Sequence, residues 1–523
     1  MQRILSADEM RSCDEATIKG LGVPGLLLME NAGRSVVDFL HQEFAPLAGK
    51  HVVVACGKGN NAGDGFVVAR HCSSAGARVT VLLTSAATGL KGDALTNFRL
   101  LRSFARAPHN TLRIERFSAR AIASLGRPDL IVDAVFGTGF AGKLHAPFSE
   151  IISWINEQDA PVVAVDIPSG VNGTTGRAEN GAVEATATVT FGCAKWGLVC
   201  NEGRDAAGKV FVVDIGIPPS VLARKAFRTF LVGADDVKAI LPQRPFSAHK
   251  YSTGKVLVIA GARGYTGAAA LCAMSVLRAG AGAAVLLTPE AVYPVLARKL
   301  TEVIVQPLPS TDAGSVSVKA LDAVRGRLDW ADVVALGPGL SQHPGTQEFV
   351  RSVVRDIHGK LLVDADGLNA LAPGGLSAVR ASGADVLLTP HTGEFSRLTG
   401  RRSEEIEERR IPAAREFAVK QKMGVVLKGA PTVTADGDGT VYVNSTGNPG
   451  MATVGSGDVL TGLVAGLWAQ GMRKADAAWA GVFLHGLAGD LAKEKLGERS
   501  LVAGDLMELL PEAIRSVERG ERV

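Results

Sequence analysis

The sequence has few of the features that mark zinc-binding, nucleic-acid-binding or membrane proteins. Aromatic residues make up only 5% of the 523 residues, and the six cysteines include no CxxC pair. Without cysteine and histidine at ligand spacing, no zinc site is expected, and the thiols are expected to be reduced and buried. Acidic and basic residues interleave to a net charge of only +4. This balance gives little support for a nucleic-acid partner.

Long apolar stretches are also missing. No window reaches about 18 uninterrupted apolar residues, so no transmembrane helix is predicted. The first residues, MQRILSADEMRSCDE, are charged and contain no long apolar core, so they do not have the pattern of a secretory signal. We therefore expect no membrane partner and a cytoplasmic location.

Glycine, by contrast, is abundant. The 61 glycines follow no collagen-like period and cluster beside short apolar runs, which is typical of many tight turns between strands and helices. With 46% apolar residues, a chain of this length exceeds the roughly 100–200 residues of one domain. We therefore predict two α/β domains.

Short apolar runs of strand length recur, each followed by a turn and a longer helical pattern, which predicts βαβ units and parallel sheets. Residues 5–45 are expected to be helical, with Ser6 and Glu9 in capping-box order. Between two series of runs, around residues 220–245, lies a proline-bearing, irregular connector, so we place the domains at residues 1–225 and 226–523. The first series is HVVVACG, ARVTVLL, LIVDAVFG, PVVAVDIPSG and ATVTFG, and the second is GKVLVIAG, AAVLLTP, DVVALGPG, KLLVDADG, DVLLTPH and GVVLKG.

Three loops of the first half carry polar residues at predicted strand ends: GKGNNAGDGF, DAVFGTGFAGK and DIPSGVNGTTG. Because ligands of open α/β sheets bind at the carboxyl ends of strands, we expect these loops to converge. Asn61, Asp133 and Ser169 would then supply only oxygen ligands, which suit a group 1 or 2 cation better than zinc. The simpler alternatives are an ordinary glycine turn and aspartates, Asp133 and Asp166, that cap helices.

These three segments resemble the signature segments of the NAD(P)H-hydrate epimerase family over about residues 1–220. The resemblance implies a Rossmann-like three-layer domain in which Asn61, Asp133 and Ser169 ligate potassium. Ala62 departs from the glycine that is usual in the family. Since epimerisation at C6 breaks and remakes a bond there, protons must pass to and from the hydroxyl group, and we assign this role to Asp166. The residues implied to bind the hydrated dinucleotide are Asn60, Asn61, Ala62, Gly63, Asp64, Gly137, Thr138, Gly139, Phe140, Ala141, Gly142, Lys143 and Asp166.

In the second half, the segment NSTGNPGMATVGSGDVLTG leads into an apolar helix that is expected to begin near Asp458. Such a helix start presents unpaired N–H groups to an anion, and a carboxylate there can accept a proton from a substrate hydroxyl. Phosphoryl transfer to an alcohol needs this combination. The simpler alternative is that Asp458 is an ordinary acid of a first helical turn. Lys428, at a strand end beside a glycine, suits nucleotide phosphate, although no Walker loop is present.

YTGAA, LGPGL, VDADGLN, TPHTGE, KGAPT and the GSGD segment together resemble the ADP- or ATP-dependent NAD(P)H-hydrate dehydratase family over roughly residues 235–515. The resemblance implies a ribokinase-like three-layer domain with Asp458 as the catalytic base. Thr392 and Val454 stand where proline and glycine are expected. The residues implied to contact the hydrated dinucleotide are Ala268, Gly339, His391 and Asp458, and those implied to bind the adenine nucleotide are Lys428, Gly429, Ala430, Pro431, Thr432 and Gly457.

Together the resemblances imply a bifunctional repair enzyme. It would epimerise the R and S forms of the hydrated cofactors NADHX and NADPHX, and dehydrate the S form with ADP, giving AMP and phosphate. Potassium in the epimerase, magnesium in the dehydratase and ADP or ATP as co-substrate are expected, and a homo-oligomer is expected from base rates. A ribokinase-like small-molecule kinase and a nucleotide-binding scaffold module are the alternatives. The fused epimerase-like half argues against the kinase, and retention of Asp166 argues against the scaffold.

Overall fold

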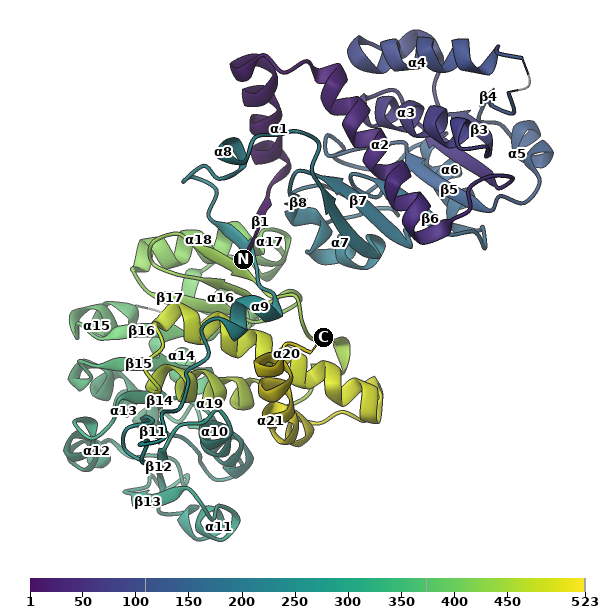
Figure 1. Cartoon of the computed structure of the whole chain (residues 1–523). Helices are drawn as coiled ribbons and strands as arrows, with labels where there is room; N and C mark the ends of the chain where they lie inside the picture. Colours follow the sequence, from purple (N-terminus) through teal and green to yellow (C-terminus); the bar gives the residue numbers. More distant parts are fainter. Residues whose placement is uncertain (109, 373, 522–523) are drawn as a thin grey trace. The chain divides into compact units, whose positions relative to one another are not determined.

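The protein is described by a computed structural model that covers residues 1–108, 110–372 and 374–521 (Figure 1). Internal contacts divide it into two compact units. The first comprises Arg3–Phe227, and the second comprises the residues from Arg228 onward together with Met1–Gln2. Both are built from alternating strands and helices, so the predicted α/β class is confirmed.

The first unit begins with a short strand and two helical segments. Its elements are β1 (Gln2–Leu5), α1 (Ala7–Glu15), η1 (Ala16–Gly20), α2 (Gly25–Phe44), β2 (His51–Cys56), α3 (Asn60–Ser74), β3 (Arg78–Leu83), η2 (Ala87–Gly89), α4 (Gly92–Ala105), β4 (Arg113–Arg116), α5 (Ala119–Leu125), β5 (Leu130–Ala134), α6 (Phe148–Asn156), β6 (Val162–Val165), β7 (Ala187–Phe191), β8 (Ala194–Lys195), η3 (Trp196–Leu198), α7 (Asn201–Ala206), β9 (Lys209–Val213) and α8 (Pro219–Leu222).

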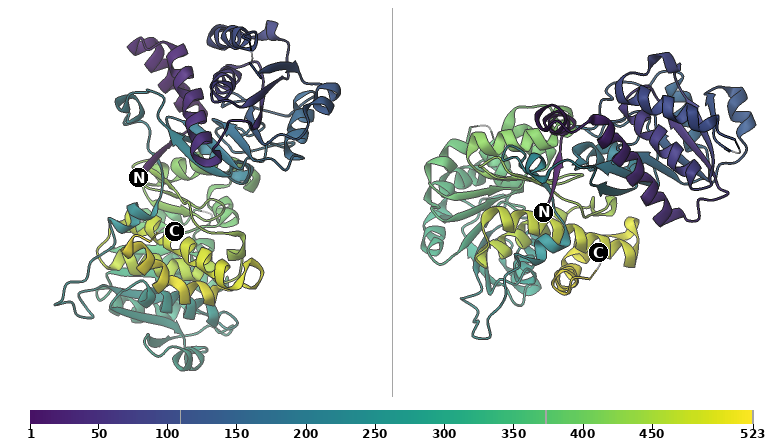
Figure 2. Two further views of the ribbon diagram at one scale, coloured as in Figure 1. Left: turned by 45° about the vertical axis from the view of Figure 1, so that its right-hand side comes forward. Right: turned by 45° about the horizontal axis from the view of Figure 1, so that its top comes forward.

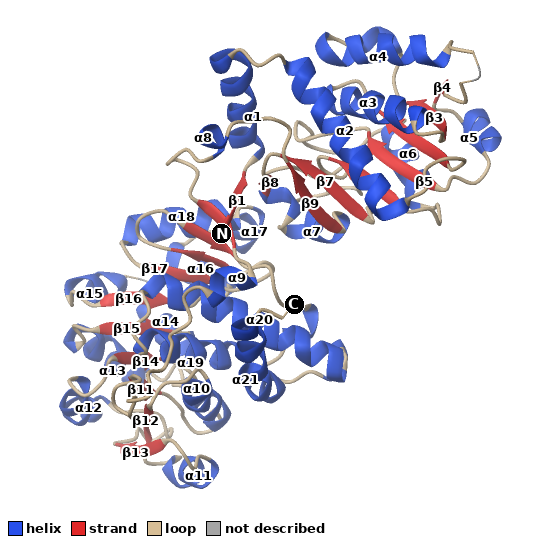
Figure 3. Cartoon of the chain, viewed as in Figure 1, coloured by secondary structure: helices blue, strands red, loops and turns tan. Residues whose placement is uncertain are grey.

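The main sheet of this unit is parallel, in the order β4-β3-β2-β5-β6-β7-β9. All of β2 is buried, as its unbroken apolar sequence predicts for a strand covered on both faces. Alternate residues face different helices: Val52 and Val54 join the core formed with α2, α3 and α4, whereas Val53 and Ala55 join the core formed with α5 and α6. Helices therefore cover both faces of the sheet (Figure 3).

The N-terminal helix starts as predicted. The Ser6 hydroxyl accepts a hydrogen bond from the backbone N–H of Glu9 at 3.1 Å, and the Glu9 carboxylate accepts one from the N–H of Ser6 at 2.8 Å. This capping box satisfies two otherwise unpaired donors. The predicted helical region is nevertheless interrupted, because residues 22–24, which precede α2, are not helical.

The second unit is also a strand-and-helix alternation. Its elements are β10 (Thr229–Leu231), α9 (Ala234–Lys238), β11 (Lys255–Ile259), α10 (Thr266–Arg278), β12 (Ala283–Pro289), α11 (Tyr293–Lys299), β13 (Ile304–Leu308), η4 (Val318–Ala320), α12 (Leu321–Leu328), β14 (Val333–Leu336), α13 (Pro344–Asp356), β15 (Lys360–Val363), α14 (Ala365–Leu371), α15 (Leu376–Ala381), β16 (Asp385–Leu388), α16 (Thr392–Thr399), α17 (Ser403–Glu408), α18 (Arg410–Gln421), β17 (Gly424–Leu427), β18 (Val433–Ala435), β19 (Val441–Val443), η5 (Pro449–Met451), α19 (Ser456–Ala469), α20 (Lys474–Leu496), η6 (Glu498–Ser500) and α21 (Ala503–Arg519).

Its sheet runs β13-β12-β11-β14-β15-β16-β17-β18-β19-β10. The strands from β13 to β17 are parallel, while β18 pairs antiparallel with both β17 and β19. Val256 and Val258 of β11 pack into a large core with α10, α19 and α20, and the other views show further helices across the opposite face (Figure 2). The predicted irregular connector at 220–245 is regular in part, because it contains β10 and α9.

Helices α10 and α19 pack closely because small residues line their contact. A Cβ atom on Gly462 of α19 would lie 2.1 Å from the carbonyl oxygen of Cys272 on α10. The two backbones can approach only while this position remains glycine. Among the described helices, none has the length and apolar content required to cross a lipid bilayer.

Replacing Gly462 with alanine should destabilise the second unit by about 1–3 kcal/mol, because the new methyl group overlaps a backbone carbonyl that cannot move freely. Urea unfolding followed by circular dichroism measures the change. Gly504→Ala on α21 is the matched control, since no atom lies within 4 Å of the position that its new methyl group would take and helix propensity alone favours alanine. Equal midpoints for Gly462→Ala and the wild type would contradict the packing argument.

Candidate active sites

Three loops of the first unit meet at the carboxyl edge of its sheet, as predicted. They follow β2, β5 and β6, which are neighbours in the sheet. The side-chain amide of Asn61 donates to the carbonyl oxygen of Phe136 at 2.8 Å, and the N–H of Phe136 donates to the Ser169 hydroxyl at 2.8 Å. These two bonds join one residue from each loop.

Asp133 lies at the centre of this junction and is completely buried. It accepts the Ser169 hydroxyl at 2.6 Å, the Ser169 N–H at 2.7 Å and the Val135 N–H at 3.2 Å. Burial raises the pKa of Asp133 to about 6, against the opposing effect of these hydrogen bonds. The alternative that Asp133 caps a helix is wrong, because its carboxylate bonds within the loops.

The three side chains predicted to ligate a cation meet at this junction. Asn61, Asp133 and Ser169 are all buried, and they bring amide, carboxylate and hydroxyl oxygens together with the carbonyl of Phe136. Such hard oxygen donors suit a group 1 or 2 cation. Within residues 1–108, 110–372 and 374–521, no group of three or more His, Cys, Asp or Glu side chains forms a metal cluster.

Residues 60–64 form the first turn of α3, whose N-cap is Gly59. The start of a helix of this length directs unpaired N–H groups toward an anion. Ala62 is fully buried, so the methyl group that distinguishes it from the usual glycine packs into the core. Asp64 is also buried, and burial together with the charges of Asp166 and Asp14 raises its pKa well above the ordinary value.

The second loop, residues 137–143, is mostly exposed and lies beside this helix start. A Cβ atom on Gly137 would lie 3.3 Å from the Cβ of Asn61. The ring of Phe140 packs at a tilt against that of Phe136, with centroids 4.7 Å apart. Asn180 closes the far end of the loop through two hydrogen bonds with the backbone of Leu144. The loop is thus anchored at both ends and open to solvent between them.

Asp166 directly follows β6 and has a φ of +67°. This left-handed conformation is uncommon for residues other than glycine, asparagine and aspartate. It does not cap a helix. Instead its Oδ1 accepts hydrogen bonds from the ammonium group of Lys195, from the Thr190 hydroxyl at 3.2 Å and from the N–H of Phe191 at 3.2 Å. The sequence analysis missed Lys195; a single lysine in the apolar segment GCAKWGL was the available signal.

In the second unit, five parallel strands end at one edge and supply the predicted loops. The loops after β11 and β14 touch, because the N–H of Gly261 donates to the carbonyl of Pro338 at 2.9 Å. Gly337 has a φ of +133°, and a Cβ there would lie 1.8 Å from the carbonyl oxygen of Asp364, so only glycine fits. Gly339 lies against Ala268: its Cβ would be 3.0 Å from that of Ala268. The structure thus brings these two predicted substrate contacts together.

Lys428, at the end of β17, is the main positive charge of this edge. Its ammonium group donates to the buried carboxylate of Asp364 at 2.7 Å, and the second oxygen of Asp364 accepts the Thr461 hydroxyl at 2.7 Å. Burial alone would lower the pKa of Lys428, but Asp364 and Glu394 raise it above its usual value. A Cβ on Gly457 would lie 3.2 Å from the lysine nitrogen. The predicted nucleotide residues Lys428 and Gly457 are therefore neighbours.

Asp458 is the third residue of α19, which begins at Ser456 rather than at Asp458 itself. Its N-cap, Gly455, has a left-handed φ of +95°. Burial raises the pKa of Asp458 to about 7; the charge of Asp364 adds to this effect and that of Lys428 opposes it. His485 of α20 lies behind this turn, with Nε2 3.4 Å from the Ser456 hydroxyl, and burial lowers its pKa to about 4. Val454, just before the turn, is 97% exposed.

His391 is the N-cap of α16, and its Nδ1 accepts the N–H groups of Gly393 and Glu394. Burial and the nearby Lys428 lower its pKa. Because Nδ1 accepts, a neutral ring carries its proton on Nε2, which lies 3.4 Å from the carboxylate of Glu394. Thr392, in place of the expected proline, donates its hydroxyl to Glu407.

The loop formed by residues 428–432 is held from behind by Arg410, which is 2% exposed. Its guanidinium group donates to the carbonyl oxygens of Leu427 at 3.0 Å, Lys428 at 2.8 Å and Pro431 at 3.1 Å. A Cβ on Gly429 would lie 2.3 Å from the same group. Arg410 therefore determines the shape of this loop, and the sequence analysis did not identify it.

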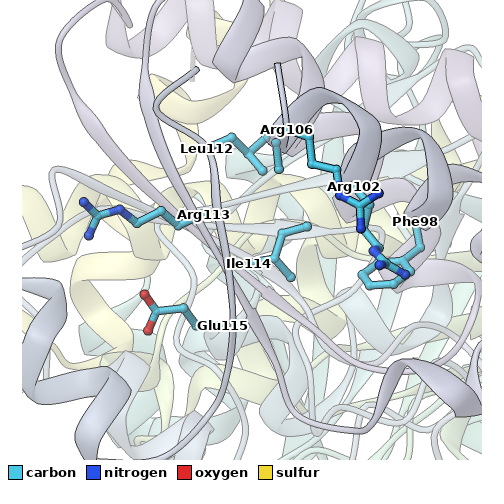
Figure 4. Close-up of a pocket in the computed structure, with 8 residues that line it drawn as sticks. Phe98, Arg102, Arg106, Leu112, Arg113, Ile114 and Glu115 are labelled. Carbon is cyan, nitrogen blue, oxygen red and sulfur yellow. The ribbon is translucent and has the colours of Figure 1, made fainter. Parts of the chain in front are cut away.

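A hollow of about 520 Å³ lies elsewhere, between α4 and β4 (Figure 4). Its lining contains none of the predicted site residues. Phe98 and Arg102 lie on one side of it and Arg113 on the other. Its arginines are exposed, and we assign it no part in the two sites. The residues that line it are Phe98, Arg102, Ala105, Arg106, Leu112, Arg113, Ile114 and Glu115.

Comparison with known proteins relates both units to described families. Residues 25–197 match the family model described as YjeF-related protein N-terminus, and residues 256–512 match that of NAD(P)H-hydrate dehydratase. The bifunctional NAD(P)H-hydrate repair enzyme of Moorella thermoacetica is 42% identical over 98% of this chain and 97% of its own. The chain belongs to the bifunctional NAD(P)H-hydrate repair enzyme family. The Salinibacter ruber member is 40% identical over 97% of this chain and 95% of its own.

Among solved structures, the ADP/ATP-dependent NAD(P)H-hydrate dehydratase of Bacillus subtilis, co-crystallised with ATP and magnesium, is 31% identical, with a TM-score of 0.47. It matches 55% of this chain and 98% of that one. Membership of the repair-enzyme family, which rests on the full-length relatives, does not favour the alternative of a small-molecule kinase fused to a scaffold module. Both halves of the chain match, and both retain polar residues at their strand ends.

Asp458→Asn should make the second unit more stable at alkaline pH. The folded-state pKa of about 7 lies above the ordinary value of 3.8. The free energy of unfolding therefore falls as pH rises from about 4 to 7, and the loss is complete above that range. Removing the charge recovers on the order of 2–4 kcal/mol at pH 8 and almost nothing at pH 4. Chemical unfolding at both pH values measures this difference. Asp322→Asn, at an exposed site in the same unit, should give no comparable gain; a pH-independent effect of Asp458→Asn would contradict the argument.

Proposed function

We propose that this chain epimerises the R and S forms of NADHX and NADPHX at C6, and dehydrates the S forms to NADH and NADPH with ADP, giving AMP and phosphate. We assign the first activity to residues 1–225 and the second to residues 226–523. The observation that carries the proposal is the pairing of a complete carboxyl-edge site in each unit with full-length membership of the repair-enzyme family.

In the epimerase, residues 60–64 and 137–143 bind the hydrated dinucleotide, and Asp166 exchanges protons with the C6 hydroxyl group. The helix start at residues 60–64 suits the dinucleotide phosphates. Asn61, Asp133 and Ser169 would hold a potassium ion, whose positive charge would offset the negative charge of the dinucleotide phosphates. In the described part of the chain, the hydrogen bonds to the Asp166 carboxylate all go to Oδ1, which leaves Oδ2 for substrate.

In the dehydratase, Ala268, Gly339 and His391 position the hydrated ring, and Asp458 removes the proton of its hydroxyl group. The hydroxyl oxygen attacks the terminal phosphorus of the nucleotide, and the phosphorylated oxygen then leaves C6 as phosphate. Loss of a ring proton restores the dihydronicotinamide double bond. With its pKa raised to about 7, Asp458 is matched to proton exchange near neutral pH.

The nucleotide is held by Lys428, by the neighbouring residues 429–432 and by Gly457. The backbone N–H groups at the start of α19 stabilise the transferred phosphoryl group. Magnesium, when bound with the nucleotide, would neutralise phosphate charge, held partly by the phosphates and by water. We prefer ADP to ATP as donor, propose a cytoplasmic location where these cofactors are used, and expect a homo-oligomer.

Absorbance at 340 nm tests both activities at once. With mixed R and S NADHX, magnesium, potassium and ADP, the protein should restore all of the NADH absorbance. Asp458→Ala should lower the rate of absorbance recovery by at least about 100-fold, because the base is lost. Asp166→Ala should leave a fast phase for the S form and a slow phase for the R form. The same reaction with ATP identifies the donor, and replacing potassium with lithium tests the cation. No recovery with either nucleotide would refute the dehydratase.

Arg410→Lys should raise the KM for the nucleotide about tenfold or more. A lysine retains the charge but cannot hold three carbonyls of the loop at once. The kinetics of dehydration at varied ADP measure the effect. The control is Arg401→Lys, which affects an exposed ion pair with Glu416 and should leave the KM unchanged. An unchanged KM in Arg410→Lys would remove Arg410 from the nucleotide site.

A further inference from the structure

Lys195, the ion-pair partner of Asp166, is a deeply buried charged side chain, with only 1% of it exposed. It lies on the two-residue strand β8, just beyond β7. Strand β1 pairs in parallel with β8, with Leu5 opposite Lys195. The indole N–H of Trp196 donates to the carbonyl of Ile4 at 3.2 Å. Both contacts tie the backbone around Lys195 to β1.

The ammonium group of Lys195 makes three hydrogen bonds. It donates to Oδ1 of Asp166, to the Thr190 hydroxyl at 3.0 Å and to the carbonyl of Phe191 at 3.0 Å. An ammonium group has three N–H donors and no acceptor, so all of them are used. Lys195 thus has no proton left for a substrate, and any role it has must be exerted through its partners.

Thr190 links the same two groups a second time. Its hydroxyl accepts from Lys195 at 3.0 Å and donates to Oδ1 of Asp166 at 3.2 Å. With the N–H of Phe191, three donors converge on Oδ1. Oδ2 accepts no hydrogen bond from the part of the chain that the structure describes, and the side chain is 14% exposed. The arrangement fixes one oxygen of Asp166 and leaves the other available.

Asp166 is one of three carboxyl groups close to the charge of Lys195. The others are Asp14 on α1 and Asp64 on α3. The thiol of Cys193, in the loop before β8, is also close to this charge: burial raises the pKa of the thiol, and Lys195 opposes the change. Burial raises the pKa of Asp14 to about 6 and that of Asp64 well above its usual value, and Lys195 opposes both changes. Only Asp166, however, receives a hydrogen bond from the lysine.

We propose that Lys195, assisted by Thr190, is the positioning residue that makes Asp166 the proton acceptor of the epimerase among the three neighbouring carboxyl groups. This inference rests on the proposed function of Asp166. A buried lysine that only stabilised the fold would need compensation for its charge, but not three donors on a single oxygen of the residue that faces the substrate.

Three variants separate these roles. Lys195→Met removes the charge but keeps the length of the side chain, and Thr190→Val removes the bridging hydroxyl but keeps the charge. Thr188→Val is the matched control: Thr188 lies two residues earlier on β7, is equally buried, and donates to the carbonyl of Ala207 at 2.7 Å without touching Asp166. The R-to-S epimerisation of NADHX is followed by chromatography from pH 5 to 9, with the dehydratase activity and the unfolding midpoint of each variant measured alongside.

We expect Lys195→Met to lower the epimerase kcat by about 100-fold and Thr190→Val by about tenfold, with KM within about twofold of the wild type. In Lys195→Met the acidic limb of the pH profile should move to higher pH, because a buried carboxylate without its ammonium partner ionises less readily. Thr188→Val should keep kcat within about twofold even if its unfolding midpoint falls as far as that of Thr190→Val. Dehydratase activity should be unchanged in all three.

Equal losses of kcat in Thr190→Val and Thr188→Val, or an unmoved pH profile in an active Lys195→Met, would overturn the positioning role. Asp166→Asn distinguishes this failure from failure of the proposed function. If Asp166→Asn is inactive while Lys195→Met retains wild-type kcat, the role of the lysine alone is refuted. If Asp166→Asn epimerises normally, the assignment of Asp166 is refuted, and the role of Lys195 with it.

Discussion

A lysine ammonium removed from water costs several kcal/mol unless oxygen atoms surround it, and each unit buries one at the carboxyl edge of its sheet. Lys195 is paired with Asp166 in the first unit, and Lys428 is paired with Asp364 in the second. In both cases a hydroxyl group, from Thr190 or Thr461, bonds to the same carboxylate. The loops that surround each pair can adopt only conformations that keep these charges matched, so the geometry of each site depends on its ion pair.

The two pairs are arranged differently because the sites have different tasks. In the first unit all three N–H donors of the lysine are used within the protein, and one of them bonds to the carboxylate that is proposed to act. In the second unit the lysine is itself proposed to meet nucleotide phosphate, and the acting carboxylate, Asp458, lies on another element and is not bonded to it. Burial raises the pKa of Asp458 and the charge of Asp364 adds to this effect, although Lys428 opposes it.

Much of this organisation could be predicted from local sequence. The short, unbroken apolar runs became the central strands, since a strand buried on both faces needs an unbroken apolar sequence. Strands such as β4, with the sequence RIER, and β13, with IVQPL, were missed because their exposed positions interrupt the apolar pattern. The convergence of Asn61, Asp133 and Ser169 followed from parallel strand order alone. Lys195 and Arg410 were not found, because each acts on a residue or loop that only the folded topology brings to it.

The pairing of β1 with β8 makes the surroundings of Lys195 depend on the first residues of the chain. The opening residues of the chain contact the strand that carries Lys195, although every sequence motif of the epimerase begins some fifty residues later. A start codon assigned slightly too far downstream, or a bulky tag fused at the N-terminus, would leave all of the recognisable motifs intact while removing or displacing the partner strand of Lys195. The integrity of the epimerase therefore has to be judged from its first five residues as well as from its glycine-rich loops.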